Sequence, residues 1–223
     1  MRILLVEDTE DLGQALFQHF LTEGHAVDWA RTGPDAEAFL RAQAYDAILL
    51  DLGIPDLSGT ELLKDLRRRR DTTPVLVMTA RALMEDKLAH FELGADDYLL
   101  KPFDLRELDA RLNALMRRLN GLAASSVRFG NFTFDGKARR AAIDGVPIEL
   151  GRREFRLLEY FVSTRGRIAS KEQIFDRLFG MEDEAGLNVV ELYVSRLRRK
   201  LEGSRFTIRT IRGLGYVAEV EGE

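Results

Sequence analysis

The first half of the chain carries a pattern of hydrophobic and polar positions that predicts buried strands alternating with helices. Nearly continuous apolar runs bounded by polar or turn-forming residues are typical of strands buried on both faces. Such runs occupy residues 2–6, 47–50, 74–78 and 97–100. Residues 26–30 alternate between apolar and polar side chains, which predicts a partly exposed edge strand. Apolar residues with a helical period occupy the stretches between the strands, at 9–21, 34–44, 58–70, 86–93 and 105–119. This alternation predicts an α/β domain, a parallel sheet with helices on both faces.

The second half of the chain predicts short strands, then helices, then a hairpin. Turn signals such as Asn-Gly and Asp-Gly separate the first strands, which favours an antiparallel meander. The predicted strands are 127–129, 132–134, 139–143 and 146–150, the helices are 152–163, 170–179 and 188–201, and the hairpin is 207–218. Residues 120–126 are small and uncharged, as in a short linker. We therefore predict one domain over 1–119, a linker over 120–126 and an α+β domain over 127–223.

Composition excludes several classes of protein. The chain is 45% hydrophobic and 31% charged, with no apolar run near the roughly 18 residues of a membrane span. Its N-terminus reaches acidic residues too early for a signal peptide. It has no cysteine, so neither a disulfide framework nor a thiolate metal site is available. We expect a cytoplasmic protein with no membrane partner.

Charge is distributed unevenly between the two halves. Residues 1–120 hold 15 basic and 22 acidic residues, whereas the rest of the chain holds 18 and 15. Within 186–212 there are seven basic residues and two acidic ones. This asymmetry indicates two domains with different partners, and the basic segment suits a polyanion.

Polar residues end four of the predicted parallel strands, and they indicate a site. They are Glu7-Asp8, Asp51, Thr79 and Lys101. A single carboxylate after a strand is usually a helix cap or a turn residue, but the carboxyl ends of parallel strands meet at the ligand-binding edge of a sheet. Clustered carboxylates favour a cation, and oxygen-only ligands favour Mg²⁺. A carboxylate in such a site can attack a phosphoryl group, whose oxygens the Lys and Thr would stabilise.

These residues carry a specific resemblance. Residues 1–120 resemble a response-regulator receiver domain, which is flavodoxin-like with a (βα)5 order. The matching pieces are Val6-Glu7-Asp8, Asp51 to Pro55, Thr79-Ala80-Arg81, Gly94 to Tyr98 and Lys101-Pro102-Phe103.

The receiver resemblance implies a role for each matching residue. Asp51 would be the phosphoacceptor, and Thr79 and Lys101 would contact the phosphoryl group. Asp8, Asp51 and the Gly53 carbonyl would bind Mg²⁺, with Glu7 helping through water. Tyr98 would be an aromatic switch that turns inward when Thr79 is drawn to the phosphate. The resemblance also implies a cis peptide bond between Lys101 and Pro102.

The OmpR/PhoB subfamily further implies a dimer of receivers. Pairs between the two copies would join Lys87 with Glu107, Asp97 with Arg111 and Asp96 with Arg118. The apolar centre of this interface would comprise Leu88, Phe91 and Ala110. Exposed ion pairs contribute only about 0–1 kcal/mol each, so such an interface suits association that phosphorylation controls.

The predicted helix at 188–201 places apolar residues on one face and polar and basic residues on the other. A helix fits the DNA major groove, and an Arg at a hairpin tip fits the minor groove. This half resembles the OmpR/PhoB winged-helix domain through Leu150 to Leu158, Val190 to Leu201 and Ile211 to Tyr216. The DNA-binding residues that follow are Asn188, Val189, Tyr193, Ser195, Arg196, Arg198, Arg199, Lys200, Arg212 and Gly213. Tyr193 and Ser195 depart from the residues common in the family, so base specificity cannot be transferred.

The sequence therefore predicts a phosphorylation-dependent transcriptional regulator. A sensor histidine kinase would phosphorylate Asp51 with Mg²⁺, the receivers would dimerise, and the winged helices would bind repeated half-sites in double-stranded DNA. The resemblance also implies a contact with RNA polymerase. Two alternatives stay open. One is a DNA-binding regulator with a vestigial receiver, and the other is a Mg²⁺-dependent phosphatase with an aspartyl-phosphate intermediate.

Overall fold

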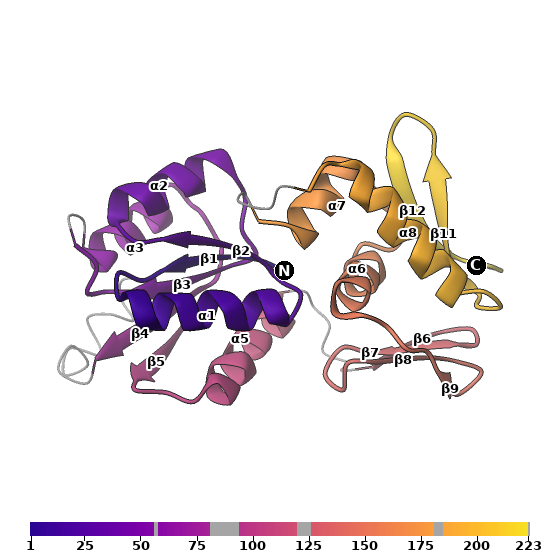
Figure 1. Cartoon of the computed structure of the whole chain (residues 1–223), viewed down its shortest axis with the longest axis horizontal. Coiled ribbons are helices and arrows are strands. Elements are labelled where there is room, and N and C mark those ends of the chain that lie inside the picture. The colour runs from indigo at the N-terminus through magenta and orange to yellow at the C-terminus, as the bar shows by residue number, and fades with distance from the viewer. Residues whose placement is uncertain (56–57, 81–93, 120–125, 181–184, 223) are drawn as a thin grey trace. The chain divides into compact units, whose positions relative to one another are not determined.

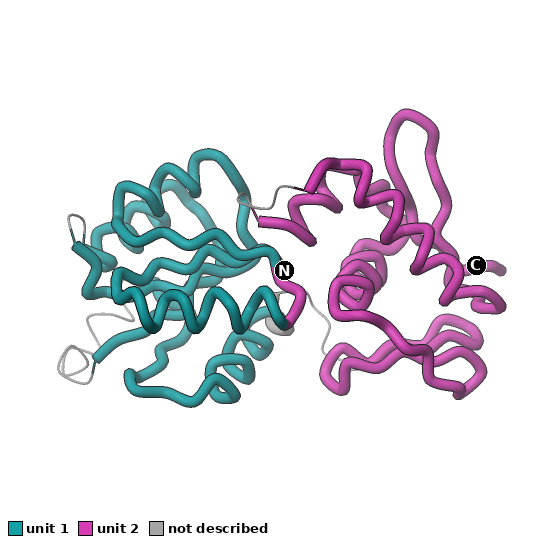
Figure 2. The backbone as a smooth tube through the Cα atoms, in the orientation of Figure 1, with its two compact units in different colours: residues 1–22, 26–121 teal, residues 23–25, 122–223 magenta. Residues whose placement is uncertain are grey.

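We describe residues 1–55, 58–80, 94–119, 126–180 and 185–222 of a computed structural model, with the side chains of 117–119 left aside. The chain forms two compact units (Figure 2). The first comprises residues 1–22 and 26–121, and the second comprises residues 23–25 and 122–223. No helix among the described ranges is long and apolar enough to cross a lipid bilayer.

The first unit contains a five-stranded parallel sheet. Its strands stand in the order β2-β1-β3-β4-β5. They are β1 (Arg2–Val6), β2 (Ala26–Ala30), β3 (Ala47–Asp51), β4 (Val75–Ala80) and β5 (Asp97–Lys101). β1 and β3 lie side by side at the centre, where every one of their side chains is buried. The continuous apolar runs of the sequence therefore correspond to strands covered on both faces.

Helices cover both faces of this sheet (Figure 1). They are α1 (Glu10–Thr22), α2 (Gly33–Ala42), α3 (Gly59–Arg68) and α5 (Leu105–Leu119). Alternate strand residues point to opposite faces, so Leu50 packs in the core with α2 and α3, whereas Leu49 packs in the core with α1 and α5. Side-chain caps begin two of the helices, since Thr32 accepts from the Asp35 N–H and Ser58 from the Glu61 N–H. The helix predicted at 86–93 lies outside the described residues.

The edge strand β2 is more buried than its alternating pattern predicted. It is at the edge of the sheet, as expected, but Asp28 is only 2% exposed. The Asp28 carboxylate pairs with Arg2 at 2.8 Å and accepts a hydrogen bond from the Tyr45 hydroxyl at 2.9 Å. A buried charge is tolerated when it is paired in this way. Burial and the neighbouring Asp28 carboxylate raise the pKa of Tyr45 above its ordinary value.

The second unit begins with a four-stranded antiparallel sheet. Its strands follow chain order as β6 (Ser126–Phe129), β7 (Phe132–Asp135), β8 (Arg140–Ile143) and β9 (Val146–Pro147). Three helices follow, namely α6 (Arg152–Ser163), α7 (Lys171–Leu178) and α8 (Asn188–Lys200). The meander and the helices agree with the sequence pattern. β9 is shorter than the predicted strand over 146–150.

The closing hairpin belongs to a three-stranded sheet. β11 (Phe206–Ile211) and β12 (Gly215–Val220) form the predicted hairpin, and β10 (Ile168–Ala169) pairs with β12. β10 was not predicted from the sequence, because two residues are too few to show a period. Gly215 has φ +133°, and a Cβ there would lie 2.1 Å from the Ala169 carbonyl oxygen. Only glycine lets the hairpin approach β10 this closely.

Candidate functional site

Three carboxylates meet at the carboxyl edge of the central strands. Glu7 and Asp8 follow β1, and Asp51 ends β3, its neighbour in the sheet. One ligand oxygen from each of the three lies within 4.8 Å of the others. Glu7 is fully buried and Asp51 is 8% exposed, whereas Asp8 is the most exposed of the three. The structure therefore brings together the acidic residues that the sequence placed at separate strand ends.

Lys101 joins this cluster from the end of β5. Its Nζ donates to Glu7 Oε2 at 2.6 Å and to Asp51 Oδ2 at 2.7 Å. Burial by itself lowers the pKa of Lys101, but hydrogen bonds and charge from Asp51 and Glu7 outweigh it and raise that pKa above its ordinary value. Lys101 therefore stays charged and holds the two buried carboxylates together. The Lys101–Pro102 peptide is cis, as the receiver resemblance implied.

The cluster suits a divalent cation. Three carboxylates against one ammonium leave an excess of negative charge that a cation would offset, and all the ligand atoms are oxygens. Two of the carboxylate oxygens already accept hydrogen bonds from the backbone. Glu7 Oε1 accepts from the Thr9 N–H at 3.3 Å, and Asp51 Oδ1 accepts from the Gly53 N–H at 3.1 Å. These bonds fix the buried carboxylates before any cation binds.

Two glycines lie beside Asp51, and one of them allows a close backbone approach. A Cβ on Gly53 would lie 3.7 Å from both Asp51 carboxylate oxygens, an ordinary van der Waals distance. A Cβ on Gly59 would lie 2.4 Å from the Asp51 carbonyl oxygen, closer than any side chain allows. The start of α3 therefore packs directly on the backbone of the site. The sequence analysis singled out Gly53 but used Gly59 only as a helix start.

Thr79 and Tyr98 lie near this edge but are not drawn into the cluster. Thr79 is 2% exposed, and its hydroxyl donates to the Ala80 carbonyl at 3.3 Å. Tyr98 is 9% exposed and packs with the core residues that α2 and α3 cover. Burial raises the pKa of Tyr98 to about 12. The ring is thus buried in this structure, and its movement with Thr79 stays a prediction.

Four of the residues predicted for a dimer interface have partners within the chain. Arg111 binds Asp97 at 3.1 Å and Glu107 at 2.9 Å. Asp96 accepts from Arg67 and from the Val75 N–H, each at 2.8 Å. Ala110 is exposed on α5. Lys87, Leu88, Phe91 and the Arg118 side chain lie outside what the structure describes.

Most of the predicted DNA-binding residues lie on α8, and four of them are exposed on the face that points away from its core. Val190, Val194 and Leu197 are buried, so the opposite face is open to solvent. Asn188, Ser195, Arg196 and Arg199 are exposed, and Val189, Tyr193, Arg198 and Lys200 are half-buried. Leu192 is also 46% exposed on this face, where the sequence pattern predicted polar and basic residues. Arg212 and Gly213 are exposed at the turn between β11 and β12.

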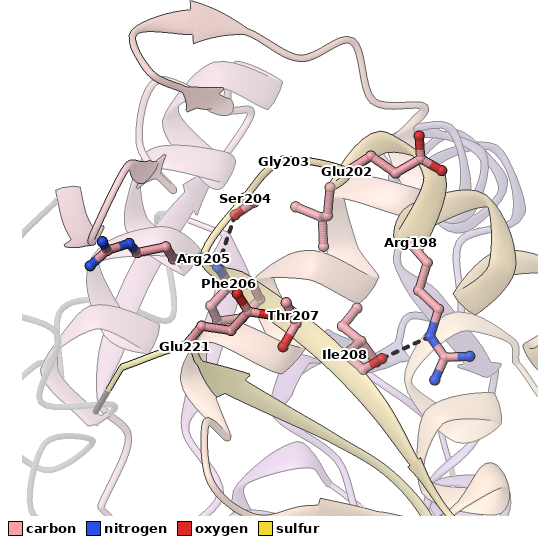
Figure 3. A pocket seen from close by; sticks show the side chains of 10 residues that line it. Arg198, Glu202, Gly203, Ser204, Arg205, Phe206, Thr207, Ile208 and Glu221 are labelled. Atoms are coloured by element: carbon pink, nitrogen blue, oxygen red, sulfur yellow. Dashed lines mark hydrogen bonds between the residues drawn. The ribbon is translucent and has the colours of Figure 1, made fainter.

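Arg198 and Lys200 also hold α8 in place. Arg198 donates to the Ile208 carbonyl at 2.8 Å (Figure 3). It also donates to the Thr210 hydroxyl at 2.8 Å, and the two bonds tie α8 to β11. Lys200 donates to Glu154 at 2.6 Å, and Glu154 also accepts from the Gly151 N–H at the start of α6. A contact of either residue with DNA stays a prediction, because both are engaged within the unit.

The Lys200–Glu154 pair makes a pH-dependent prediction. Burial raises the pKa of Glu154, but hydrogen bonds from Lys200 and Gly151 outweigh it and leave that pKa below its ordinary value of 4.5. Lys200→Met should lower the free energy of unfolding by about 1–2 kcal/mol near neutral pH. A carboxylate with a depressed pKa contributes stability above its unfolded pKa and loses it as pH falls through the folded value. Urea unfolding followed by circular dichroism should therefore give curves that converge with wild type at acidic pH. A constant gap would contradict this role.

A hollow of about 370 Å³ lies where α8 gives way to β11 (Figure 3). Of the predicted DNA-binding residues, Arg198 is the one that lines it. The rest of its wall consists of Leu201, Glu202, Gly203, Ser204, Arg205, Phe206, Thr207, Ile208 and Glu221. Both acids and bases line it, so its charge favours no particular ligand.

Comparisons with known proteins agree with both halves. Residues 3–113 match the response regulator receiver domain family, and residues 145–218 match the family described as "Transcriptional regulatory protein, C terminal". The chain is 42% identical to the transcriptional regulatory protein QseB of Escherichia coli O157:H7, over 97% of this chain and 98% of that protein. It is 40% identical to the response regulator protein PmrA of Pseudomonas aeruginosa, over 97% of each.

The first unit is similar to solved receiver domains. The receiver domain of a Francisella response regulator is 34% identical with a TM-score of 0.50, and the match covers 53% of this chain and 98% of that domain. The α/β receiver and the winged-helix order of the second unit agree with these matches. The chain therefore belongs to the OmpR/PhoB family of two-component response regulators, which regulate transcription under the control of phosphorylation.

Proposed function

We propose that Asp51 accepts a phosphoryl group from a sensor histidine kinase and thereby controls DNA binding by α8. The observation that carries this proposal is the contact of Lys101 with Asp51 and Glu7 inside the acidic cluster. A lysine held by an acceptor carboxylate is already in place to bind a phosphoryl oxygen. Asp51 keeps enough exposure, at 8%, for a donor to reach it.

The transfer that we propose is a displacement at phosphorus. One Asp51 oxygen attacks the phosphorus, the phosphorus–nitrogen bond of the donor's phosphohistidine breaks, and the nitrogen keeps the bonding pair. Oxygens of Asp8, Asp51 and Gly53, with Glu7 through water, would hold Mg²⁺, whose charge offsets that of the phosphoryl oxygens. Lys101 would turn from Asp51 to the new phosphoryl group, and the Thr79 hydroxyl would leave the Ala80 carbonyl for it. Tyr98 would then fill the space that Thr79 leaves. The only further reaction that we expect of the protein is slow hydrolysis of the Asp51 acyl phosphate.

The output that we propose is a dimer on DNA. The pairs that Arg111 makes with Asp97 and Glu107 are partly open to solvent and worth about 0–1 kcal/mol each, so exchange for pairs with a second copy costs little. The α8 face would enter the major groove and Arg212 the minor groove, which supports binding to repeated half-sites. We further propose that the DNA-bound protein contacts RNA polymerase. We also propose that it acts in the cytoplasm.

Sedimentation velocity tests the link between Asp51 and dimer formation. Addition of Mg²⁺ with beryllium fluoride, a phosphoryl mimic, should convert wild type from monomer to dimer. Asp51→Asn should stay unchanged, because the mimic needs the carboxylate. Asp35→Asn is the matched control, since Asp35 is exposed in the first turn of α2, and it should respond like wild type. If the Asp51→Asn variant dimerised as wild type does, the proposed acceptor would be wrong.

A further inference from the structure

Trp29, the single tryptophan of the chain, lies beside the acidic cluster and has no part in the function above. It is on the edge strand β2, and its indole Nε1 donates to the Glu7 carbonyl oxygen at 2.8 Å. Glu7 is the fully buried member of the cluster. The indole therefore contacts the backbone at the point where β1 passes into the site.

The indole packs against α1 at Gly13. A Cβ on Gly13 would lie 2.1 Å, 2.4 Å and 2.8 Å from three indole atoms, so α1 can approach only because residue 13 has no side chain. The Arg31 guanidinium lies over the ring, 5.4 Å from its centroid, and pairs with Glu10 at 2.7 Å. The ring is thus enclosed by α1 and by the residue that follows β2.

The contact of the indole completes a set of bonds that fixes Glu7. The Glu7 N–H donates to the Ala30 carbonyl at 3.0 Å, and the Glu7 side chain is held by Lys101 and by the Thr9 N–H. The remaining polar group, the Glu7 carbonyl, accepts from Trp29. That carbonyl lies in the same rigid peptide plane as the Asp8 N–H. Its orientation therefore fixes the position of the Asp8 Cα, the atom from which the Asp8 side chain leaves the backbone.

We propose that Trp29 is a positioning residue for the cation site of Glu7, Asp8 and Asp51. Its indole N–H fixes the Glu7–Asp8 peptide, so the Asp8 carboxylate is oriented toward Asp51 before an oxygen-liganded divalent cation binds. Gly13 is part of the same device, because it makes room for the ring. This inference rests on the proposed function, since it concerns the cation that accompanies phosphorylation of Asp51. Trp29 lies outside the sequence motifs that carry the receiver resemblance.

Isothermal titration with MgCl₂ tests the proposal on the full chain. Trp29→Phe keeps an aromatic ring but loses the donor, and it should weaken Mg²⁺ binding roughly three- to tenfold, the range expected for one hydrogen bond that supports a ligand. Gly13→Ala keeps the donor but displaces the ring, and it should weaken binding in the same range. Arg41→Gln is the control, because it removes an exposed cation of the same unit that pairs with Glu37 on α2, and its affinity should equal wild type.

Two further readouts separate positioning from a purely structural role. Titration of wild type with MgCl₂ should change the emission of Trp29 with the same dissociation constant as the calorimetry. Urea unfolding of each variant measures stability, and a purely structural Trp29 would lower stability without changing Mg²⁺ affinity. That result, or unchanged affinity in Trp29→Phe, would overturn the proposal. Asp51→Asn distinguishes failure of the Trp29 proposal from failure of the proposed function. Wild-type Mg²⁺ affinity in that variant would overturn the proposed function itself.

Discussion

Asp51→Asn should abolish the uptake of a phosphoryl group from a small acyl phosphate donor. The amide has the shape of the carboxylate, but it has no anionic oxygen to attack phosphorus. Lys101 keeps Glu7 as its second partner at 2.6 Å, so the fold of the site should survive the change. Intact-protein mass spectrometry after incubation with the donor and Mg²⁺ measures the effect. Wild type should gain the mass of one phosphoryl group, and the variant should gain none.

Two controls accompany this experiment. Asp35→Asn alters an exposed carboxylate of the same unit and should take up the phosphoryl group as wild type does. Chelation of Mg²⁺ by EDTA should suppress uptake in wild type, because the excess negative charge of the cluster is then uncompensated. Uptake by Asp51→Asn at the wild-type level would place the acceptor on another side chain.

Arg196→Ala should weaken DNA binding by roughly tenfold or more, the range expected when an Arg that contacts a base or a phosphate is lost. Arg196 is exposed on the α8 face, and its guanidinium lies 5.9 Å from the centroid of the Tyr193 ring. It is free of the internal bonds to β11 and α6 that hold Arg198 and Lys200. Fluorescence anisotropy with a DNA segment that the protein protects in footprinting measures the affinity.

A salt series tells what Arg196 contacts. Loss of one phosphate contact should reduce the slope of log K against log salt by about 0.9, whereas loss of a base contact should relax specificity with little change in slope. Arg140→Ala is the control of equal charge, since Arg140 is exposed on β8. Affinity in Arg196→Ala equal to that of the Arg140→Ala control would exclude α8 as the recognition helix.

Most of the fold follows from hydrophobic periodicity in the sequence. β1 and β3 were predicted because a strand buried on both faces needs an uninterrupted apolar run, and both are fully buried. The acidic cluster was predicted from the strand assignment, because parallel strands bring their carboxyl ends together at one edge of the sheet. α8 was predicted from a stripe of apolar residues, which the structure buries as Val190, Val194 and Leu197.

What the sequence did not predict depends on contacts between residues far apart in the chain. Asp28 looked like an exposed strand residue, and only its pairing with Arg2 and Tyr45 allows its burial. The fit of Trp29 against Gly13 has no local signal, since neither residue alone suggests the other. The sequence placed Arg198 among the DNA-binding residues of a helix face. Its bonds to Ile208 and Thr210 depend on the position of β11, which the helix pattern does not reveal.

The measurement that tests the central claim most directly is a DNA titration of wild type and Asp51→Asn, each with and without Mg²⁺ and beryllium fluoride. Anisotropy with a DNA segment that carries both half-sites gives four affinities. We predict that the mimic tightens binding of wild type and leaves Asp51→Asn unchanged, because the mimic needs the Asp51 carboxylate. Equal affinities for wild type with and without the mimic, or equal tightening in both proteins, would contradict it.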